Sequence, residues 1–440
     1  MRELIGGYRH HYRVTRIVEP VKAMAFRYTL PPGRFLVLDP EEETDQKFLI
    51  KHAAKVGPIF RTVFDSQLCI CVIGLSRCRR LLQENSANLA ALSRDLRGLF
   101  PEGFLRQMEG DVHQKYKRAT VKAIDPTFIS RHAAELEGIV ADELAHYADH
   151  QEAGISSPEK YEEVLNNVSS ALLILVFFGA RAGTKRFEAL ERMYDALGAN
   201  GDVWCIGEPQ KQSFFEIRDY LNAQLAGQGL DDDPYWQQSI IGRMHNNGAL
   251  DETSLGNLIY MVEIGRHDLQ RLFRWLSKYG AENSEILRVI AAGTAQDALD
   301  KEGLSRRFVL ETLRLNQSER LMRIVSRDIE FDGYRIPKNF MVRLCMWESH
   351  KSPDLFPEPF SFRPERFANN AVGKDRFSPF GMDHHSCPLA DISISLSTLF
   401  LSVLARSYKV YPVGDGPPVR GEYHWEPAKS FSVRLREREL

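Results

Sequence analysis

Apolar residues recur every three or four positions over most of the chain, which is the pattern of a helix with one buried face. This periodicity predicts helices at 131–150, 159–178, 185–198, 212–227, 304–315 and 391–407. The longest helix is expected to begin after Asp251, a residue type that often caps helix N-termini. The apolar stretch 169–180 is shorter than the ~18 residues that a membrane helix needs. We therefore interpret it as a buried helix end that stops near Gly179.

Shorter apolar runs predict strands. Residues 60–64 and 68–73 alternate or cluster apolar side chains and precede a helix-like segment. Asp332 and Gly333 separate two further short runs, and this dipeptide predicts a β-hairpin turn. No internal repeat, low-complexity tract or long linker interrupts the sequence, so we expect one domain over residues 1–440, mostly helical with a small strand-rich part.

The composition is that of a globular protein, with 440 residues, 43% hydrophobic residues and a net charge of -2. A charge so near zero gives no indication of binding to nucleic acid or to an anionic membrane. The charged N-terminal residues are not followed by an apolar run, so we expect no secretory signal, no membrane anchor and a cytoplasmic location. Six cysteines are scattered along the chain, which fits neither a disulfide framework nor paired zinc ligands.

Three polar elements follow one another in the C-terminal part. Glu311 and Arg314 are three positions apart on a predicted helix, so their side chains share a face and can pair. A second arginine, Arg366, lies in the proline-containing segment RPERF, and Cys387 follows in FGMDHHSC. Taken alone, a Glu-x-x-Arg pair is most often a solvated surface pair, so the combination carries the argument.

In this order the elements resemble the cytochrome P450 family, and the resemblance extends over nearly the whole chain. It implies a mainly α fold, with a large helical body and a small β-rich lobe near the N-terminus. It implies a structural cluster of Glu311, Arg314 and Arg366, and Cys387 as the thiolate ligand of the iron in heme b. Phe380 would pack against the proximal face of the heme.

The loop before the cysteine departs from the family pattern. The family usually has glycine at the positions of Asp383 and Leu389. Since aspartate tolerates positive φ better than most residues, we expect a changed turn at Asp383. The alternatives are a zinc site of Asp383, His384, His385 and Cys387, or a plain core cysteine. The crowding of these residues does not match standard zinc spacing, and we favour heme.

The resemblance also implies residues for the heme propionates. His113 and Lys117, four positions apart, match the aromatic or histidine residue and the base of the family's helix over the heme edge. Arg323 matches an arginine in the first strand after the Glu-x-x-Arg helix, and His385 matches a basic residue two before the cysteine. The alternative for each is an ordinary surface charge.

The long helix is expected to cross the distal heme face, where the family places an acid followed by threonine as a proton-transfer pair. When the chain is aligned by Gly265, His267 takes the place of the acid and Asp268 that of the threonine. A shifted alignment puts Glu263 at the acid position. We therefore treat His267, Asp268 and Glu263 as candidate catalytic residues and Gly265 as a cofactor contact. The alternative is that these polar side chains face away from the heme.

These features predict a heme-thiolate enzyme that oxidises a small organic substrate, in a biosynthetic pathway, with non-standard oxygen activation. One alternative is an enzyme that uses peroxide, or that rearranges a substrate N–O or O–O bond. Another is a non-catalytic heme- or ligand-binding protein, which we disfavour because the cysteine and the Glu-Arg-Arg cluster are kept.

Without a membrane anchor the chain resembles the soluble bacterial members of the family, which implies a ferredoxin-type electron donor as partner. A carrier protein that tethers the substrate is equally compatible. The stretch 85–109, which we expect to be a mobile loop, would contribute to specificity. Its Arg94, Arg97 and Arg106 are candidates for binding an acidic group.

Overall fold

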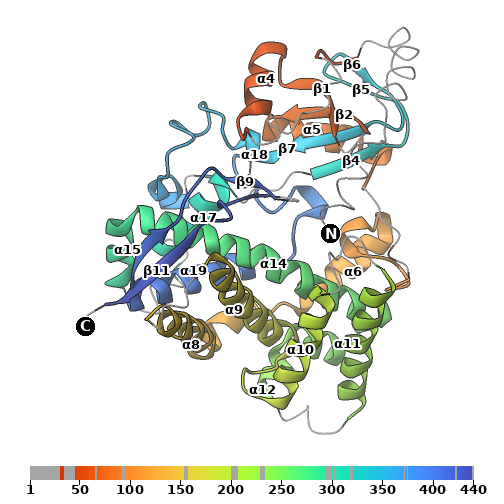
Figure 1. Cartoon of the computed structure of the whole chain (residues 1–440). Coiled ribbons are helices and arrows are strands. Elements are labelled where there is room, and N and C mark those ends of the chain that lie inside the picture. Colours follow the sequence, from red (N-terminus) through yellow and green to blue (C-terminus); the bar gives the residue numbers. More distant parts are fainter. Residues whose placement is uncertain are drawn as a thin grey trace.

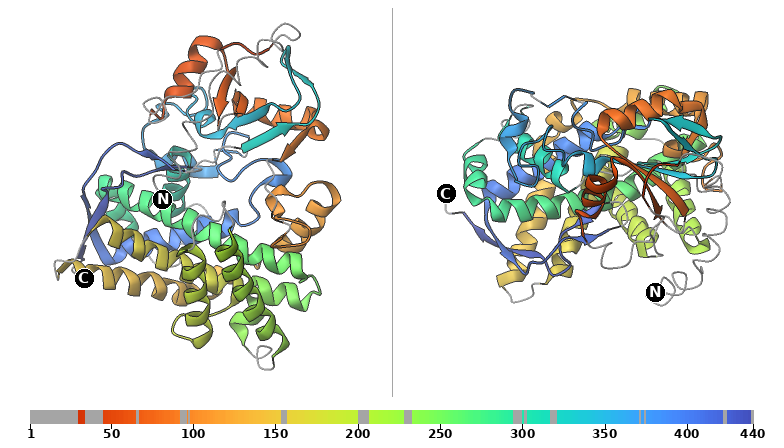
Figure 2. Two further views of the ribbon diagram at one scale, coloured as in Figure 1. Left: turned by 45° about the vertical axis from the view of Figure 1, so that its right-hand side comes forward. Right: turned by 90° about the horizontal axis from the view of Figure 1, so that it is seen from above.

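The computed structural model describes residues 30–33, 45–64, 67–91, 96, 98–152, 157–199, 207–227, 233–293, 300, 303–316, 321–370, 372–373, 375–421 and 424–438. They form a helical body with a smaller β-rich lobe on one side, as Figures 1 and 2 show from three directions. The predicted mainly α fold class is confirmed. The prediction of one domain over 1–440 stays a prediction.

The helices of the body include most of those that the periodicity predicts. α14 (Glu252–Glu282) is the longest described helix and crosses the middle of the body (Figure 1). The Asp251 side chain caps it, 2.8 Å from the amide of Ser254. The other helices before α14 are α6 (Gly110–Ala123), α7 (Phe128–Arg131), α8 (Ala133–Glu152), α9 (Pro158–Phe178), α10 (Lys185–Ala199), α11 (Glu208–Ala226), α12 (Pro234–Gln238) and α13 (Ile240–Asn246). Those after it are α15 (Ser284–Ala291), α17 (Leu304–Leu315), α18 (Met346–Ser349) and α19 (Ala390–Ser407).

The β-rich lobe is built on a five-stranded sheet with the strand order β1-β2-β7-β4-β3. Its strands are β1 (Ile59–Phe64), β2 (Gln67–Ile73), β3 (Leu89–Ala91), β4 (Leu321–Val325) and β7 (Met341–Cys345). β2 and β7 pair in parallel, and the other neighbours pair antiparallel. The lobe therefore joins the start of the chain to a segment about 270 residues later.

Two helices and one hairpin complete this lobe. α4 (Phe48–Val56) and α5 (Leu75–Glu84) contact the sheet. β5 (Ile329–Phe331) and β6 (Tyr334–Ile336) form the predicted hairpin, whose turn has φ of 48° at Asp332 and 77° at Gly333.

Two smaller strand pairs lie near the C-terminus. β8 (Tyr408–Val413) pairs with β11 (Ser432–Glu437), and β9 (Val419–Arg420) pairs with β10 (Trp425–Glu426). The 3-10 turns are η1 (Ser86–Asn88), η2 (Leu105–Gln107), η3 (Pro364–Asn370) and η4 (Asp383–His385).

Two helices are long and apolar enough to cross a membrane by length and composition, namely α9 and α19. In the fold, 78% and 67% of their apolar windows are buried. They are the central helices of the hydrophobic core, and α9 ends, as predicted, at Gly179 with φ of 59°. Their hydropathy is therefore accounted for by packing inside the protein.

The stretch 85–109, expected to be a mobile loop, contains η1, β3 and η2 in its described part. Phe100 and Phe104 from this stretch are buried against Tyr260 of α14. Asn257 of α14 accepts a hydrogen bond from the amide of Leu105 at 2.7 Å. Apolar packing and the hydrogen bond between the Leu105 amide and Asn257 therefore fix η2 against α14.

The predicted Glu-Arg pair is a fully buried ion pair in α17. The guanidinium of Arg314 donates to both carboxylate oxygens of Glu311 at 2.7 and 2.8 Å. Arg366 joins them, with its Nε 3.3 Å from Glu311 Oε1. Arg314 also donates to the carbonyls of His350 and Pro359 at 3.1 and 2.7 Å. The buried charges are thus matched by partners, as a low-dielectric interior requires.

Substitution of Glu311 by Gln tests this cluster. It would leave two arginines without their carboxylate, and removal of one partner of a buried pair costs about 3–5 kcal/mol. We expect a large fall in the midpoint of denaturant unfolding. The matched control is Glu285→Gln, which removes an exposed i,i+3 pair with Arg288 and should leave the midpoint almost unchanged. Equal effects of the two substitutions would contradict the proposed role of the cluster.

Candidate active site

A cavity lies between α14, η2, α6 and the loop that precedes α19. The space between its lining atoms, part of it open to solvent, is about 1240 Å³. Most of its wall is apolar, formed by Leu173, Met261, Ile264, Leu269, Leu272 and Leu313. A small number of polar side chains interrupt this wall, and these are the groups that can direct chemistry.

Cys387 lies on one wall of the cavity, and its accessible surface faces the cavity. Its amide donates to the carbonyl of Phe380 at 2.9 Å, which closes a tight loop over the intervening residues. Gly381 and Asp383 have φ of 87° and 55°. Asp383 thus adopts the left-handed conformation that glycine takes most readily, in keeping with the tolerance expected of aspartate; the changed turn stays a prediction. Phe380 lines the same cavity.

The surroundings of Cys387 disfavour ionisation of its thiol. Burial raises its pKa, the nearby Asp268 carboxylate adds to this, and a hydrogen bond from the Leu389 amide opposes it. A free thiol here would stay protonated at neutral pH, whereas coordination to a metal ion removes the proton.

The edge of the cavity is rich in basic side chains. His113 and His385 are in ring contact, with centroids 4.4 Å apart. Within the described part of the chain, the Nδ1 atoms of both rings are buried and lack a hydrogen-bond partner. Burial lowers the pKa of His113 to about 4, with the nearby His385 and Lys117 acting in the same direction. His113 is thus a neutral hydrogen-bond donor at physiological pH.

Lys117 connects α6 to the cysteine loop. Its ammonium donates to the carbonyl of Ser386 at 2.6 Å and to that of His384. It also lines the cavity, so it is placed to bind a propionate while it holds the loop.

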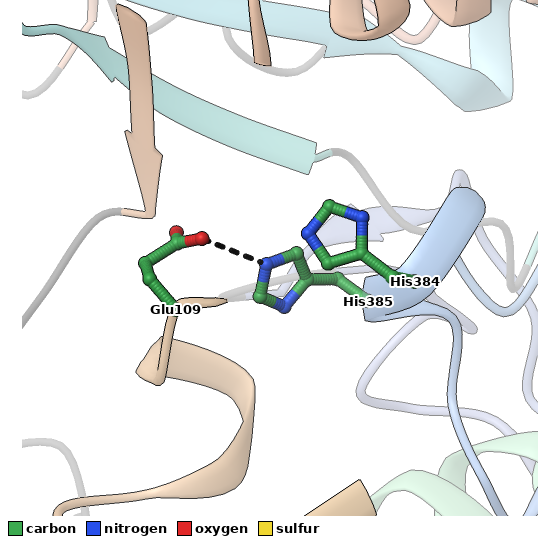
Figure 3. A group of neighbouring side chains, drawn as sticks. All are labelled: Glu109, His384 and His385. Carbon is green, nitrogen blue, oxygen red and sulfur yellow. Dashed lines mark ion pairs between the residues drawn. The ribbon is translucent and has the colours of Figure 1, made fainter. Parts of the chain in front are cut away.

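A neighbouring pocket shares His385 with the cavity and contains Arg323, Asp383, His384 and Glu109. Figure 3 shows Glu109, at the start of α6, directed toward His385, with 3.5 Å between the carboxylate and Nε2. Ligand atoms of Glu109, His384 and His385 lie within 4.8 Å of one another. Among the described residues, the potential ligand atoms that gather here include Glu109 but neither Asp383 nor Cys387, so the alternative zinc site with the cysteine is not formed.

Arg323 is buried behind this edge and lies in the neighbouring pocket rather than on the cavity wall. It donates to the carbonyl of Met322 at 2.9 Å. Its predicted contact with a propionate therefore stays a prediction.

On the opposite wall, α14 contributes Gly265 and Asp268 to the cavity. A Cβ at Gly265 would lie 3.1 Å from Leu173 of α9, so glycine allows close packing at this point. The side chain of Asp268 is 49% exposed, and its Oδ1 lies 3.5 Å from His424 Nε2. Burial alone would raise the pKa of Asp268, but His424, Arg271 and Arg106 lower it overall. Asp268 is thus ionised at neutral pH.

The other two predicted catalytic residues do not line the cavity. Glu263 is 0% exposed and pairs with Arg266 at 2.9 Å, and Arg266 donates to the Tyr194 carbonyl of α10. His267 is 42% exposed and contacts Glu263 at 3.3 Å. Glu263 and His267 are four positions apart and share a helix face, which lies beside the face that lines the cavity with Ile264, Gly265, Asp268 and Leu269. The predicted place of Glu263 and His267 beside the heme is therefore not found in the cavity lining; Glu263 instead holds Arg266, which connects α14 to α10 through the Tyr194 carbonyl.

Two polar residues on the cavity wall have no counterpart in the motifs of the family. His424, at the start of β10, was not predicted, because nothing in the sequence near it indicates a contact with α14. Arg106, in η2, lies on the wall as well, whereas Arg94 and Arg97 lie outside the described residues.

These residues fit a heme. The cavity offers a thiol on one wall, an aromatic ring beside it and apolar side chains around it. At its edge stand two buried ring nitrogens without a partner among the described residues, and an ammonium group. This is the set of groups that an apolar macrocycle with two carboxylates and an iron would need.

Comparisons with known proteins agree with this geometry. A family model described as Cytochrome P450 matches residues 283–425. The abscisic acid 8'-hydroxylase of Solanum lycopersicum is 24% identical over 88% of this chain and 87% of its own length. Ent-kaurenoic acid oxidase 2 of Arabidopsis thaliana is 22% identical over 91% of this chain and 86% of its own length.

Among solved structures, a cyanobacterial CYP120A1 with bound retinoic acid superposes with a TM-score of 0.71 and 19% identity. It covers 93% of this chain and 100% of its own length. This likeness supports the fold. Together with the buried Glu-Arg-Arg cluster and the Cys387 loop, the family model and the relatives show that the chain belongs to the cytochrome P450 family and uses heme b.

Proposed function

We propose that this heme-thiolate enzyme oxidises a small, mostly apolar molecule that carries a carboxylate. The observation that carries the proposal is the apolar cavity with the Cys387 thiol on one wall and the Arg106 guanidinium on another. Two of the relatives are named for acidic substrates, abscisic acid and ent-kaurenoic acid, and the structural relative holds retinoic acid.

Arg106 is a basic group that is not assigned to the heme propionates, so it can bind a substrate carboxylate. The resemblance assigns His113, Lys117, Arg323 and His385 to the propionates, and Arg106 is a further cation that lines the cavity. Guanidinium binds carboxylate in a bidentate geometry, and such charged hydrogen bonds are stronger than neutral ones.

When bound, heme with a thiolate ligand supplies oxygen activation, since the thiolate favours cleavage of the O–O bond. The apolar wall around it excludes water and holds the hydrocarbon part of the substrate. Arg106 fixes the acidic end and thereby decides which carbon faces the centre of the cavity. Asp268 is the residue on the distal wall that accepts and delivers a proton at its carboxylate.

Oxygen activation in this enzyme is proposed to be non-standard. A carboxylate stands where the family has a threonine hydroxyl, and the residue at the preceding acid position, His267, lies away from the cavity. The use of peroxide is the second candidate, because a carboxylate on the distal wall can take the proton of hydrogen peroxide directly.

The proposal also includes where the enzyme acts, the kind of pathway it serves and its protein partners. A cytoplasmic location, a role in biosynthesis and a ferredoxin-type or carrier-protein partner stay predictions.

The thiolate is tested by Cys387→Ser. We expect the substituted protein to lose the absorbance spectrum of thiolate-ligated heme, because a serine hydroxyl stays protonated and is a poor iron ligand. Cys69→Ala, at a buried cysteine of β2, is the control and should keep the spectrum. A thiolate spectrum in the Cys387→Ser protein would contradict the assignment.

The acid specificity is tested by titrating the heme spectrum with retinoic acid and with its methyl ester. Arg106→Gln should weaken binding of the acid by roughly tenfold to a hundredfold, the range expected from ~1.5–3 kcal/mol for a charged hydrogen bond. Binding of the ester should change little. Lys115→Gln, on the exposed face of α6, is the control.

Equal losses for acid and ester would contradict this role of Arg106. Loss of heme on substitution of Arg106 would instead make it a propionate ligand and would also contradict the proposal.

The peroxide route is tested by supplying hydrogen peroxide, or oxygen with chemically supplied electrons, to the acid-bound holoenzyme. Turnover with peroxide alone, at a rate at least equal to that with oxygen, is the result expected of a peroxide-using enzyme. Turnover confined to the oxygen reaction would identify a monooxygenase.

A further inference from the structure

The distal carboxylate has a partner on a different part of the chain. His424 enters the cavity wall from the C-terminal hairpin of β9 and β10 and places Nε2 3.5 Å from Asp268 Oδ1. Its side chain is only 8% exposed, whereas Asp268 is 49% exposed. The carboxylate thus faces the open space, and the imidazole lies behind it.

Two contacts hold the hairpin against α14, and a third closes its turn. Trp275 Nε1 donates to the carbonyl of Trp425 at 2.7 Å, and Arg271 Nε lies 2.9 Å from Glu426. The turn of the hairpin is closed by the Gly421 amide, which donates to the carbonyl of His424 at 2.9 Å. The imidazole is therefore positioned from both sides rather than by its contact with Asp268 alone.

The second ring nitrogen of His424 is available for a further hydrogen bond or proton. Nδ1 is buried, and no described residue provides a hydrogen-bond partner for it. A buried polar atom of this kind is rare unless it serves a purpose such as proton exchange. An imidazole with one nitrogen on a carboxylate and the other available can pass a proton through its ring.

We propose that Asp268 and His424 form the proton-transfer pair of the distal site, connecting α14 to the C-terminal hairpin instead of running along α14. This inference rests on the proposed heme-thiolate function. A proton carried by a water molecule that reaches the buried Nδ1 of His424 binds there, and the proton on Nε2 moves to Asp268 Oδ1. Asp268 delivers it to the acceptor in the cavity, and exchange between the ring tautomers then restores the proton on Nε2. One proton is consumed in each passage, and neither residue is oxidised or reduced.

The neighbouring charges suit this arrangement. Arg271 lies 3.8 Å from Asp268, and Arg106 approaches from η2, so the carboxylate remains charged between transfers. Arg271 also pairs with Glu426, which neutralises it and leaves the imidazole as the closer partner of Asp268.

The test uses the intact holoenzyme with carbon monoxide bound to the reduced heme, because the C–O stretching frequency reports charges and hydrogen bonds on the distal side. Asp268→Asn and His424→Gln should each shift the frequency. The double variant should show no more than the shift of the stronger single variant, as expected for residues that act as a unit. His146→Gln is the control: it makes the same change of side chain at an exposed histidine of α8, which does not line the cavity.

A second measurement separates proton transfer from positioning. Oxygen consumption by the chemically reduced holoenzyme should fall several-fold in His424→Gln and in Asp268→Asn, and its rate should respond differently to deuterium oxide than that of the wild type. His146→Gln should behave as the wild type. His424→Gln keeps a hydrogen-bonding side chain but cannot pass a proton, so a purely structural histidine would tolerate it.

Failure of this inference and failure of the proposed function give different results. An unchanged C–O frequency and oxygen rate in His424→Gln would overturn the inference, and so would equal effects of His146→Gln and His424→Gln. Absence of the carbon monoxide band of thiolate-ligated heme in the wild type would be a failure of the proposed function itself.

Discussion

The ion pair between Glu311 and Arg314 is the constraint on which the arrangement of the site depends. A fully buried guanidinium must find an acceptor for each N–H group, and two of its acceptors are the carbonyls of His350 and Pro359. The chain is therefore held over α17 at these points. Burial keeps the pKa of His350 well below its usual value, so the ring is neutral and accepts the amide of Ser378 at 3.0 Å. Ser378 begins the loop that ends at Cys387.

Different walls of the resulting cavity carry different functional groups. Basic groups gather at the edge near His385, the thiol stands on one face, and Asp268 stands on the other as a carboxylate. Apolar side chains fill the rest, so the interior has a low dielectric constant and these few charges act strongly on whatever is bound. Arg106, on η2, adds a positive charge where an acidic substrate can meet it.

The sequence predicts much of this, because its strongest signals are local. The spacing of Glu311 and Arg314 puts both on one helix face, and the turn residues around Asp383 and Cys387 lie next to one another. The side of α14 that faces the cavity was harder to predict, since a shift by one position exchanges His267 for Asp268. His424 was beyond prediction, because its contact with Asp268 spans more than 150 residues and depends on how the C-terminal hairpin packs.

The most direct test of the central claim is X-ray absorption at the iron edge of the purified ferric protein. If Cys387 is the ligand that the fold presents, the spectrum contains one sulfur scatterer at about 2.3 Å, the usual length of a metal–thiolate bond, and this scatterer disappears in Cys387→Ser. A wild-type spectrum with only nitrogen and oxygen ligands would contradict the account, because the cavity would then not be organised around a thiolate.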